Sequence, residues 1–325
     1  MGGTGLPVTP VGVGLAAVGR PAYINLGRAR DLGPRRSVED MEQRALSLLD
    51  VAYDAGVRYF DVARSYGRAE RFLAAWLSAR DIAPGQVTVG SKWGYTYVGA
   101  WHLNAAVHEV KDHSVDALRR QYEESRQLLG DHLRLYQIHS ATIDTGVLAD
   151  TSVTSELAAL AERGLVLGLS LSGPQQTEAL ELALDVEVEG TNPFSCVQAT
   201  FNLLEPSVGD ALKEAHEAGW GVVAKEVFAN GRLVGPELDR RIEDRALLEH
   251  VAKSYETTLD ALALSWALSH DFVDVALSGA VTPAQLKSNL SALDVPFDAE
   301  DRAVFDPLRE PPATYWRTRS GFDWS

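Results

Sequence analysis

Residues 56–70 read Gly-Val-Arg-Tyr-Phe-Asp-Val-Ala-Arg-Ser-Tyr-Gly-Arg-Ala-Glu, a pattern typical of a strand that connects to a helix. A short apolar run ends at an acid, Asp61, and Tyr66 follows on a turn closed by glycine before a helical pattern begins at Ala69. A carboxylate at the end of a strand, with a phenol on the loop beyond it, suits proton transfer to a carbonyl oxygen. Because a phenol is a weak acid near neutral pH, this interpretation requires a lysine elsewhere that lowers its pKa.

The same strand-then-helix pattern recurs along the 325 residues. The expected strands cover residues 11–15, 58–61, 87–92, 133–139, 166–170, 196–200, 221–225 and 273–277. The expected helices cover residues 37–56, 69–79, 115–129, 156–163, 208–218, 247–269 with a break at 254–258, and 283–293, and a long loop is expected at 94–113. Eight alternating units favour a closed (β/α)8 TIM barrel of the α/β class, one domain over residues 1–325. A doubly wound sheet is disfavoured because no Gly-x-Gly-x-x-Gly opens a helix directly after a strand.

Composition excludes several classes of protein. A formal net charge of −15 argues against a surface for nucleic acid or anionic membrane. No basic leader with an apolar stretch is evident, and no window is long enough for a membrane span. The single cysteine, Cys196, cannot form an intrachain disulfide, and this favours the reducing environment of the cytoplasm. Its apolar neighbours indicate a small core residue rather than a nucleophile.

Polar side chains end three neighbouring strands of the expected barrel. Asp61, Lys92 and His139 end the second, third and fourth strands, and Tyr66 follows the second. Active sites of such barrels lie at the carboxyl ends of the strands, so these four side chains are expected to share one pocket. Lys92 would lower the pKa of Tyr66, Asp61 would keep Lys92 charged, and a neutral His139 would orient the substrate oxygen. Taken singly, Asp61 could cap the next helix, Lys92 could be a solvated side chain at the end of its strand, and His139 could be a hydrogen-bonded core histidine.

These residues and their spacing resemble the aldo-keto reductase superfamily. Residues 56–70 match the signature of that family, Ser91-Lys92-Trp93 resembles its lysine segment, and residues 136–140 resemble its histidine segment. The resemblance implies a catalytic tetrad of Asp61, Tyr66, Lys92 and His139, with Tyr66 as proton donor. It also implies hydride transfer between a nicotinamide and an aldehyde, ketone or sugar, with no metal.

The resemblance further implies a nicotinamide cofactor extended across the mouth of the barrel. Ser170 and Gln198 match residues that bind the carboxamide, whereas Leu171 departs from the usual asparagine, a role that Ser172 could take. The loop that clasps the pyrophosphate corresponds to residues 224–233; the predicted contacts are Lys225, Glu226, Val227, Ala229 and Gly231.

Lys225 or Glu226 stands where the family usually has an aromatic platform for the nicotinamide. Two interpretations remain open: a local Lys–Glu ion pair, with another residue in the stacking role, or a contact of Lys225 with an anionic group of cofactor or substrate.

Residues 278–289 resemble the motif on the adenosine side of the cofactor, with contacts at Gly279, Thr282, Gln285 and Asn289. Thr282 to Gln285 also reads as a capping box with proline at the first helical position. No basic residue for a 2′-phosphate is obvious, since Lys287 should face away. NADP(H) is predicted from the tendency of the family, and NAD(H) is not excluded.

The substrate pocket is expected from variable loops, with Tyr23, Trp93, Tyr95 and Trp101 as its residues. Aromatic residues of the C-terminal tail could wall the pocket or pin the tail to the barrel; they are Tyr315, Trp316, Phe322 and Trp324. Two alternatives to a general carbonyl reductase stay open: a sugar dehydrogenase or epimerase of a biosynthetic pathway, and a nucleotide-binding regulatory subunit with little turnover. The partner is a small molecule; the oligomeric state is open, with a monomer as the default.

Overall fold

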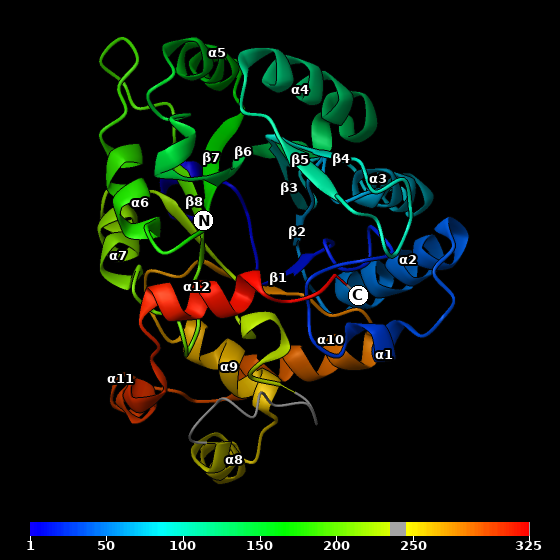
Figure 1. Cartoon of the computed structure of the whole chain (residues 1–325), viewed down its shortest axis with the longest axis vertical. Helices are drawn as coiled ribbons and strands as arrows, with labels where there is room; N and C mark the ends of the chain where they lie inside the picture. The colour runs from blue at the N-terminus through cyan, green and yellow to red at the C-terminus, as the bar shows by residue number, and fades with distance from the viewer. Residues whose placement is uncertain (235–244, 325) are drawn as a thin grey trace.

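The computed structural model describes residues 1–234 and 245–324, and within them eight parallel strands close into a barrel (Figure 1). The order around the barrel is β1-β10-β9-β8-β7-β6-β3-β2. The strands are β1 (Val11–Gly14), β2 (Tyr59–Asp61), β3 (Thr88–Trp93), β6 (Leu133–Ala141), β7 (Val166–Leu171), β8 (Cys196–Thr200), β9 (Gly221–Lys225) and β10 (Val275–Ser278). The predicted (β/α)8 barrel in a single domain is confirmed.

Helices surround this barrel. They are α1 (Arg28–Leu32), α2 (Val38–Asp54), α3 (Ala69–Ala79), α4 (Val115–Leu129), α5 (Thr151–Glu162), α6 (Gln176–Leu184), α7 (Gly209–Glu217), α8 (Arg245–Ser254), α9 (Leu259–Leu268), α10 (Pro283–Leu290), α11 (Ala299–Arg302) and α12 (Pro312–Ser320). Among the described residues, no helix combines the length and apolar character needed to cross a lipid bilayer.

Local sequence explains why these helices begin where they do. Ser37 accepts a hydrogen bond from the backbone of Asp40, and the side chain of Asp40 accepts one from the backbone of Ser37, so the two residues form a capping box at the start of α2. Its buried residues, Met41, Ala45, Leu48, Leu49 and Ala52, recur at helical spacing and pack on the barrel. A serine or threonine hydroxyl likewise caps α4, α9 and α10.

Three connections differ from the prediction. The expected loop at 94–113 contains an antiparallel pair, β4 (Tyr95–Tyr97) and β5 (Glu109–Lys111). Helix α5 begins at Thr151 rather than 156, because Asp150 caps its first backbone N–H groups. The helices α1, α6, α11 and α12 were not predicted; α1 and α11 have only five and four residues, whereas α6 buries Ala179, Leu180 and Ala183 at helical spacing and was missed.

The carboxyl ends of the strands form one mouth. Asp61 pairs in register with Gly14, Ser170 with Gln198, and Thr200 with Lys225, so polar groups from different strands reach similar heights. Helix α12, red in Figure 1, crosses this mouth close to the end of the chain. Residues from the far end of the sequence therefore join the site.

Candidate active site

The buried ammonium group of Lys92 contacts two of the other predicted catalytic residues, Asp61 and Tyr66. Lys92 Nζ, on β3, forms an ion pair with Asp61 at the end of β2 and also donates to the carbonyl of Val62 (3.2 Å). The same nitrogen lies 3.5 Å from the hydroxyl oxygen of Tyr66. The side chains of Lys92 and Asp61 are 0% and 3% exposed, so the charges are neutralised by each other rather than by water.

Two further groups hold Asp61 in place. Gln198, a predicted cofactor residue, donates its amide to Asp61 Oδ2 (2.9 Å), and the hydroxyl of Tyr59 lies 3.4 Å from the same oxygen. The carboxylate therefore accepts hydrogen bonds from its own strand, through Tyr59, and from β8 on the opposite side of the barrel, through Gln198. This agrees with its predicted place as the counter-ion of Lys92.

An irregular stretch of β6 presents His139 to the cavity. The register of β6 with β7 shifts between Ile138 and Ala141, and Ser140 has a positive φ of 54°. The backbone N–H of Ser140 donates to Ser170 Oγ (2.9 Å), which fixes this bend. The imidazole lies edge-on to Tyr66, with ring centroids 5.4 Å apart. Burial, reinforced by Lys92 and Arg20, holds the pKa of His139 well below its usual range, so the ring is neutral, as predicted.

The acidity of Tyr66 differs from the expectation. Burial raises the pKa of Tyr66 well above its usual range; Asp61 adds to this effect and Arg20 opposes it. The predicted lowering of this pKa by Lys92 does not follow from the structure, because burial has the largest effect on Tyr66 and the carboxylate of Asp61 adds to it. Tyr66 is a protonated phenol across physiological pH, the form that donates a proton.

Arg20, in the loop after β1, belongs to the site although the sequence did not single it out. Its guanidinium lies 5.2 Å from the centre of the Tyr66 ring and 4.8 Å from that of Trp324. It is 1% exposed and donates to Glu109 on β5 (2.7 Å). Trp324 in turn stacks on His108 with ring centroids 4.4 Å apart, which brings the C-terminal tail over the site.

These groups line one cavity of about 720 Å³ that also reaches α10. Of the predicted residues, the following line it: Asp61, Tyr66, His139, Ser170, Gln198, Lys225, Glu226, Val227, Gly231, Gly279, Gln285 and Asn289. Ser172 lines it as well, whereas Leu171 is buried in the core. The volume lies in the range of cofactor pockets, and its polar groups are spread along its length, which fits an extended nicotinamide dinucleotide.

At the α10 end, the predicted adenosine residues are already hydrogen-bonded. Gln285 donates to Asp31 Oδ2 (2.7 Å), and its own carbonyl oxygen accepts from the backbone of Val281 (2.9 Å). The amide of Asn289 contacts Ser278 Oγ (2.7 Å). Thr282 accepts from the backbone of Gln285 as the cap of α10, and it does not line the cavity.

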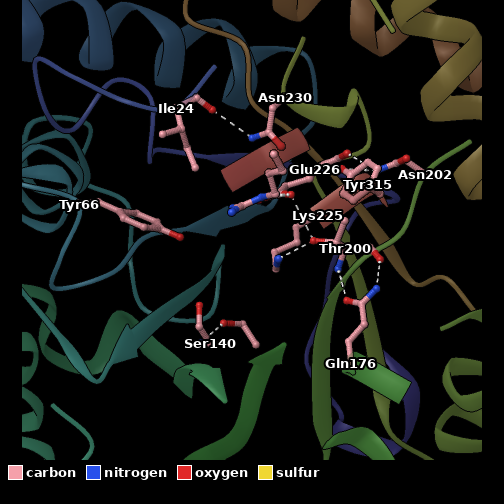
Figure 2. A network of polar contacts seen from close by, with 12 residues as sticks. Ile24, Tyr66, Ser140, Gln176, Thr200, Asn202, Lys225, Glu226, Asn230 and Tyr315 are labelled. Atoms are coloured by element: carbon pink, nitrogen blue, oxygen red, sulfur yellow. Dashed lines mark hydrogen bonds and ion pairs between the residues drawn. The ribbon is translucent and has the colours of Figure 1, made fainter. Parts of the chain in front are cut away.

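Lys225 and Glu226 are separated by a hydroxyl group (Figure 2). Lys225 Nζ donates to Thr200 Oγ1 (2.7 Å), and that hydroxyl donates to Glu226 Oε2 (3.3 Å). Glu226 pairs instead with Arg319 of α12, whose Nε lies 2.8 Å from Oε2. The interpretation of a local ion pair between Lys225 and Glu226 is therefore replaced by a bridge between Glu226 and the C-terminal helix.

The pair of Glu226 and Arg319 predicts a pH-dependent loss of stability in the Glu226→Gln variant. Burial raises the pKa of Glu226, but Arg319 and Lys225 outweigh it and lower the pKa from 4.5 to about 2. This lowered pKa adds stability above pH 4.5 that is lost as the pH falls toward 2. We expect Glu226→Gln to lower the free energy of unfolding by about 3 kcal/mol at pH 7, and by less at pH 3, in urea titrations.

Glu217→Gln serves as the matched control. Its carboxylate is 66% exposed and lies 3.8 Å from Lys213 on the same helix, so its removal should change stability by less than about 0.5 kcal/mol. Equal losses in the two variants, or a loss for Glu226→Gln that does not shrink at low pH, would contradict the assignment.

Two of the four predicted substrate residues line the cavity, and the other two do not. Tyr23 and Tyr95 line the cavity. Trp93 is fully buried and packs against His113, with ring centroids 5.7 Å apart. Trp101 lies at a separate hollow, where its indole N–H donates to the carbonyl of Arg36 (2.8 Å). Ala229, a predicted cofactor residue, is buried and does not line the cavity.

The family model described as Aldo/keto reductase family matches residues 30–310. The chain belongs to this family. It is therefore an oxidoreductase of carbonyl and alcohol substrates, in a family that uses nicotinamide cofactors.

Similar curated proteins include two dehydrogenases. Pyridoxal 4-dehydrogenase of Microbacterium luteolum is 26% identical, and the match covers 89% of this chain and 91% of that protein. D-threo-aldose 1-dehydrogenase of a Pseudomonas species is 26% identical over 90% of this chain and 92% of that protein. A solved aldo-keto reductase from Bacillus halodurans, in its holo form, has a TM-score of 0.70 at 22% identity, covering 96% of both chains, and supports the fold.

Proposed function

We propose that Tyr66 exchanges the proton in a reaction that interconverts an aldehyde, ketone or sugar carbonyl with its alcohol. The observation that supports this most is the contact of the Tyr66 hydroxyl with the buried Lys92, in a cavity that Tyr66 and the neutral His139 line together. The residues of that cavity would hold NADP(H), whose nicotinamide would supply or accept the hydride.

Each remaining residue has a defined part in this proposal. The ammonium group of Lys92, held by Asp61, would stabilise negative charge that develops on the Tyr66 oxygen when its proton leaves. His139, being neutral, would donate a hydrogen bond to the substrate oxygen and orient it. Ser170 and Gln198 would hold the nicotinamide end of the cofactor, and Gln285 and Asn289 its adenosine end.

The preference for NADP(H) rests on charge at the α10 end of the cavity. Arg30 lines this end, and a guanidinium there suits a 2′-phosphate. Asp31, 3.4 Å from Arg30 Nε, would instead accept a free 2′-hydroxyl group, as an NAD(H) enzyme requires. We retain NADP(H) as the proposal, and cytoplasmic location and a monomeric state as predictions from the sequence.

An assay at 340 nm tests this function. Purified protein is given NADPH or NADH with a panel of aldehydes, ketones and sugars, and NADP⁺ or NAD⁺ with alcohols and sugars. We expect turnover with at least one substrate class and a lower KM for NADPH than for NADH. A tenfold preference for NADH would overturn the choice of cofactor. Cofactor binding without turnover on the whole panel would favour the regulatory alternative.

A specialised dehydrogenase of sugars or related alcohols is the second candidate. It is favoured by the names of the two similar curated proteins, pyridoxal 4-dehydrogenase and D-threo-aldose 1-dehydrogenase. Faster turnover in the oxidation arm than in the reduction arm of the same assay would select it.

A further inference from the structure

The cationic side chains beside the proposed reaction centre differ in how they are paired. Arg20 contacts Glu109, Lys92 contacts Asp61, and Arg319 contacts Glu226, each within ion-pair distance. Lys225 lines the same cavity, yet within residues 1–234 and 245–324 no carboxylate oxygen lies within 4.0 Å of its Nζ. Its charge is the one in this group without a contact counter-ion in the described part of the chain.

The surroundings of Lys225 fix the direction of its ammonium group. One of its three donors is used on Thr200 Oγ1. The hydroxyl of Thr200 cannot turn freely, because it donates to Glu226, and Arg319 holds that carboxylate through two nitrogens. The ring of Trp316, 5.9 Å from Nζ, covers another side. The remaining donors are left for a ligand in the cavity.

Lys225 and Tyr66 face the same space. Figure 2 shows their polar ends approaching from different sides, above Ser140, and both line the cavity. Lys225 is also close enough to Lys92 and Asp61 to interact with them electrostatically. It thus lies at the Tyr66 end of the cavity, away from Gln285 and Asn289.

We propose that Lys225 binds the anionic group, a carboxylate or phosphate, of a substrate whose carbonyl lies at Tyr66 and His139. This proposal rests on the proposed function and names its substrate class: carbonyl compounds that carry a negative charge. The pyrophosphate of the cofactor is the other possible source of an anion. The position of Lys225 beside the reaction centre favours the substrate.

The pKa of Lys225 predicts how selectivity for an anionic substrate should depend on pH. Burial lowers the pKa of Lys225 to about 8. Arg319 and Lys92 also lower this pKa, whereas the carboxylates of Glu226 and Asp61 raise it. Among the other groups at the cavity, Tyr66 stays protonated and His139 stays neutral over this range. Lys225 is charged at pH 7 and loses its charge above pH 8, so selectivity for an anion should fall across that interval.

Matched aldehydes test the proposal. We would measure kcat/KM for 4-carboxybenzaldehyde and for its neutral methyl ester, methyl 4-formylbenzoate, with the wild type and with Lys225→Met and Lys225→Arg. Lys225→Met should lower the ratio of acid to ester by about tenfold or more, because it removes a hydrogen bond between charged groups. Lys225→Arg should retain most of the ratio, and the wild-type ratio should fall from pH 7 to pH 9. Lys213→Met, a remote and exposed lysine, should leave the ratio unchanged.

Two binding measurements separate this proposal from the others. Benzoate binding to the protein with cofactor, by calorimetry, should weaken about tenfold in Lys225→Met, and this result does not depend on turnover. Absence of turnover with intact, Lys225-dependent benzoate binding would overturn only the proposed function. A ratio and a benzoate affinity that Lys225→Met leaves unchanged would overturn the anion site. Weaker cofactor binding with an unchanged ratio would assign Lys225 to the pyrophosphate instead.

Discussion

Tyr66→Phe is expected to lower turnover by about 10²–10⁴-fold, the usual contribution of a positioned acid or base. The substitution removes only the hydroxyl group, which lies 3.5 Å from Lys92 Nζ, and leaves the ring packed edge-on against His139. The fold and the cofactor affinity should therefore persist. The measurement is kcat for the best substrate of the panel, with the unfolding midpoint and cofactor affinity determined on the same preparation.

Tyr95→Phe is the matched control for this experiment. Tyr95 also lines the cavity and lies edge-on to His139, with ring centroids 4.9 Å apart, but within the described part of the chain it forms no hydrogen bond with Lys92 or Asp61. Its substitution should lower turnover far less than Tyr66→Phe does. Similar losses in the two variants, or a Tyr66→Phe enzyme close to wild type, would remove Tyr66 from its proposed role.

The barrel and the placement of the four tetrad residues could be predicted because each depends on local pattern. Short apolar runs that end in Asp61, Lys92 and His139 mark the carboxyl ends of strands, and parallel strands bring those ends together. Trp93 was wrongly predicted to contact substrate, and its burial in the core could have been predicted. Successive residues of a strand point to opposite sides, so with Lys92 inside the barrel Trp93 must face the helices.

Other residues of the site could not be found from local pattern. Arg20 lies in an irregular loop, Glu109 on the short two-stranded pair of β4 and β5, and Arg319 on a helix near the end of the chain. Their meeting depends on how α12 and the β4–β5 pair close over the mouth, which is decided by packing between distant segments. The effect of Asp61 on the acidity of Tyr66 likewise depends on burial, which spacing along the chain does not report.

Lys92→Met is expected to lower the free energy of unfolding by about 3–5 kcal/mol, the cost of removing one partner from a buried ion pair. The variant keeps most of the side-chain volume but leaves the carboxylate of Asp61, 3% exposed, with Gln198 and Tyr59 as its only side-chain partners among residues 1–234 and 245–324. Turnover should fall as well, because the ammonium group beside the Tyr66 oxygen is gone. Urea titration at pH 7 measures the first effect and steady-state kinetics the second.

The double variant Asp61→Asn/Lys92→Met separates charge from packing. Because it removes both charges, it should regain most of the stability that Lys92→Met loses, since an uncharged pair carries no unpaired buried charge. Its turnover should nevertheless stay low, because the ammonium group that lies beside the oxygen of Tyr66 is then gone. If the double variant were as unstable as the single one, packing rather than charge would explain the loss. If it were both stable and active, Lys92 would have no part in the chemistry. Tyr66 would then have to act with another cation, and Arg20, whose guanidinium lies 5.2 Å from the centre of the Tyr66 ring, would be the candidate.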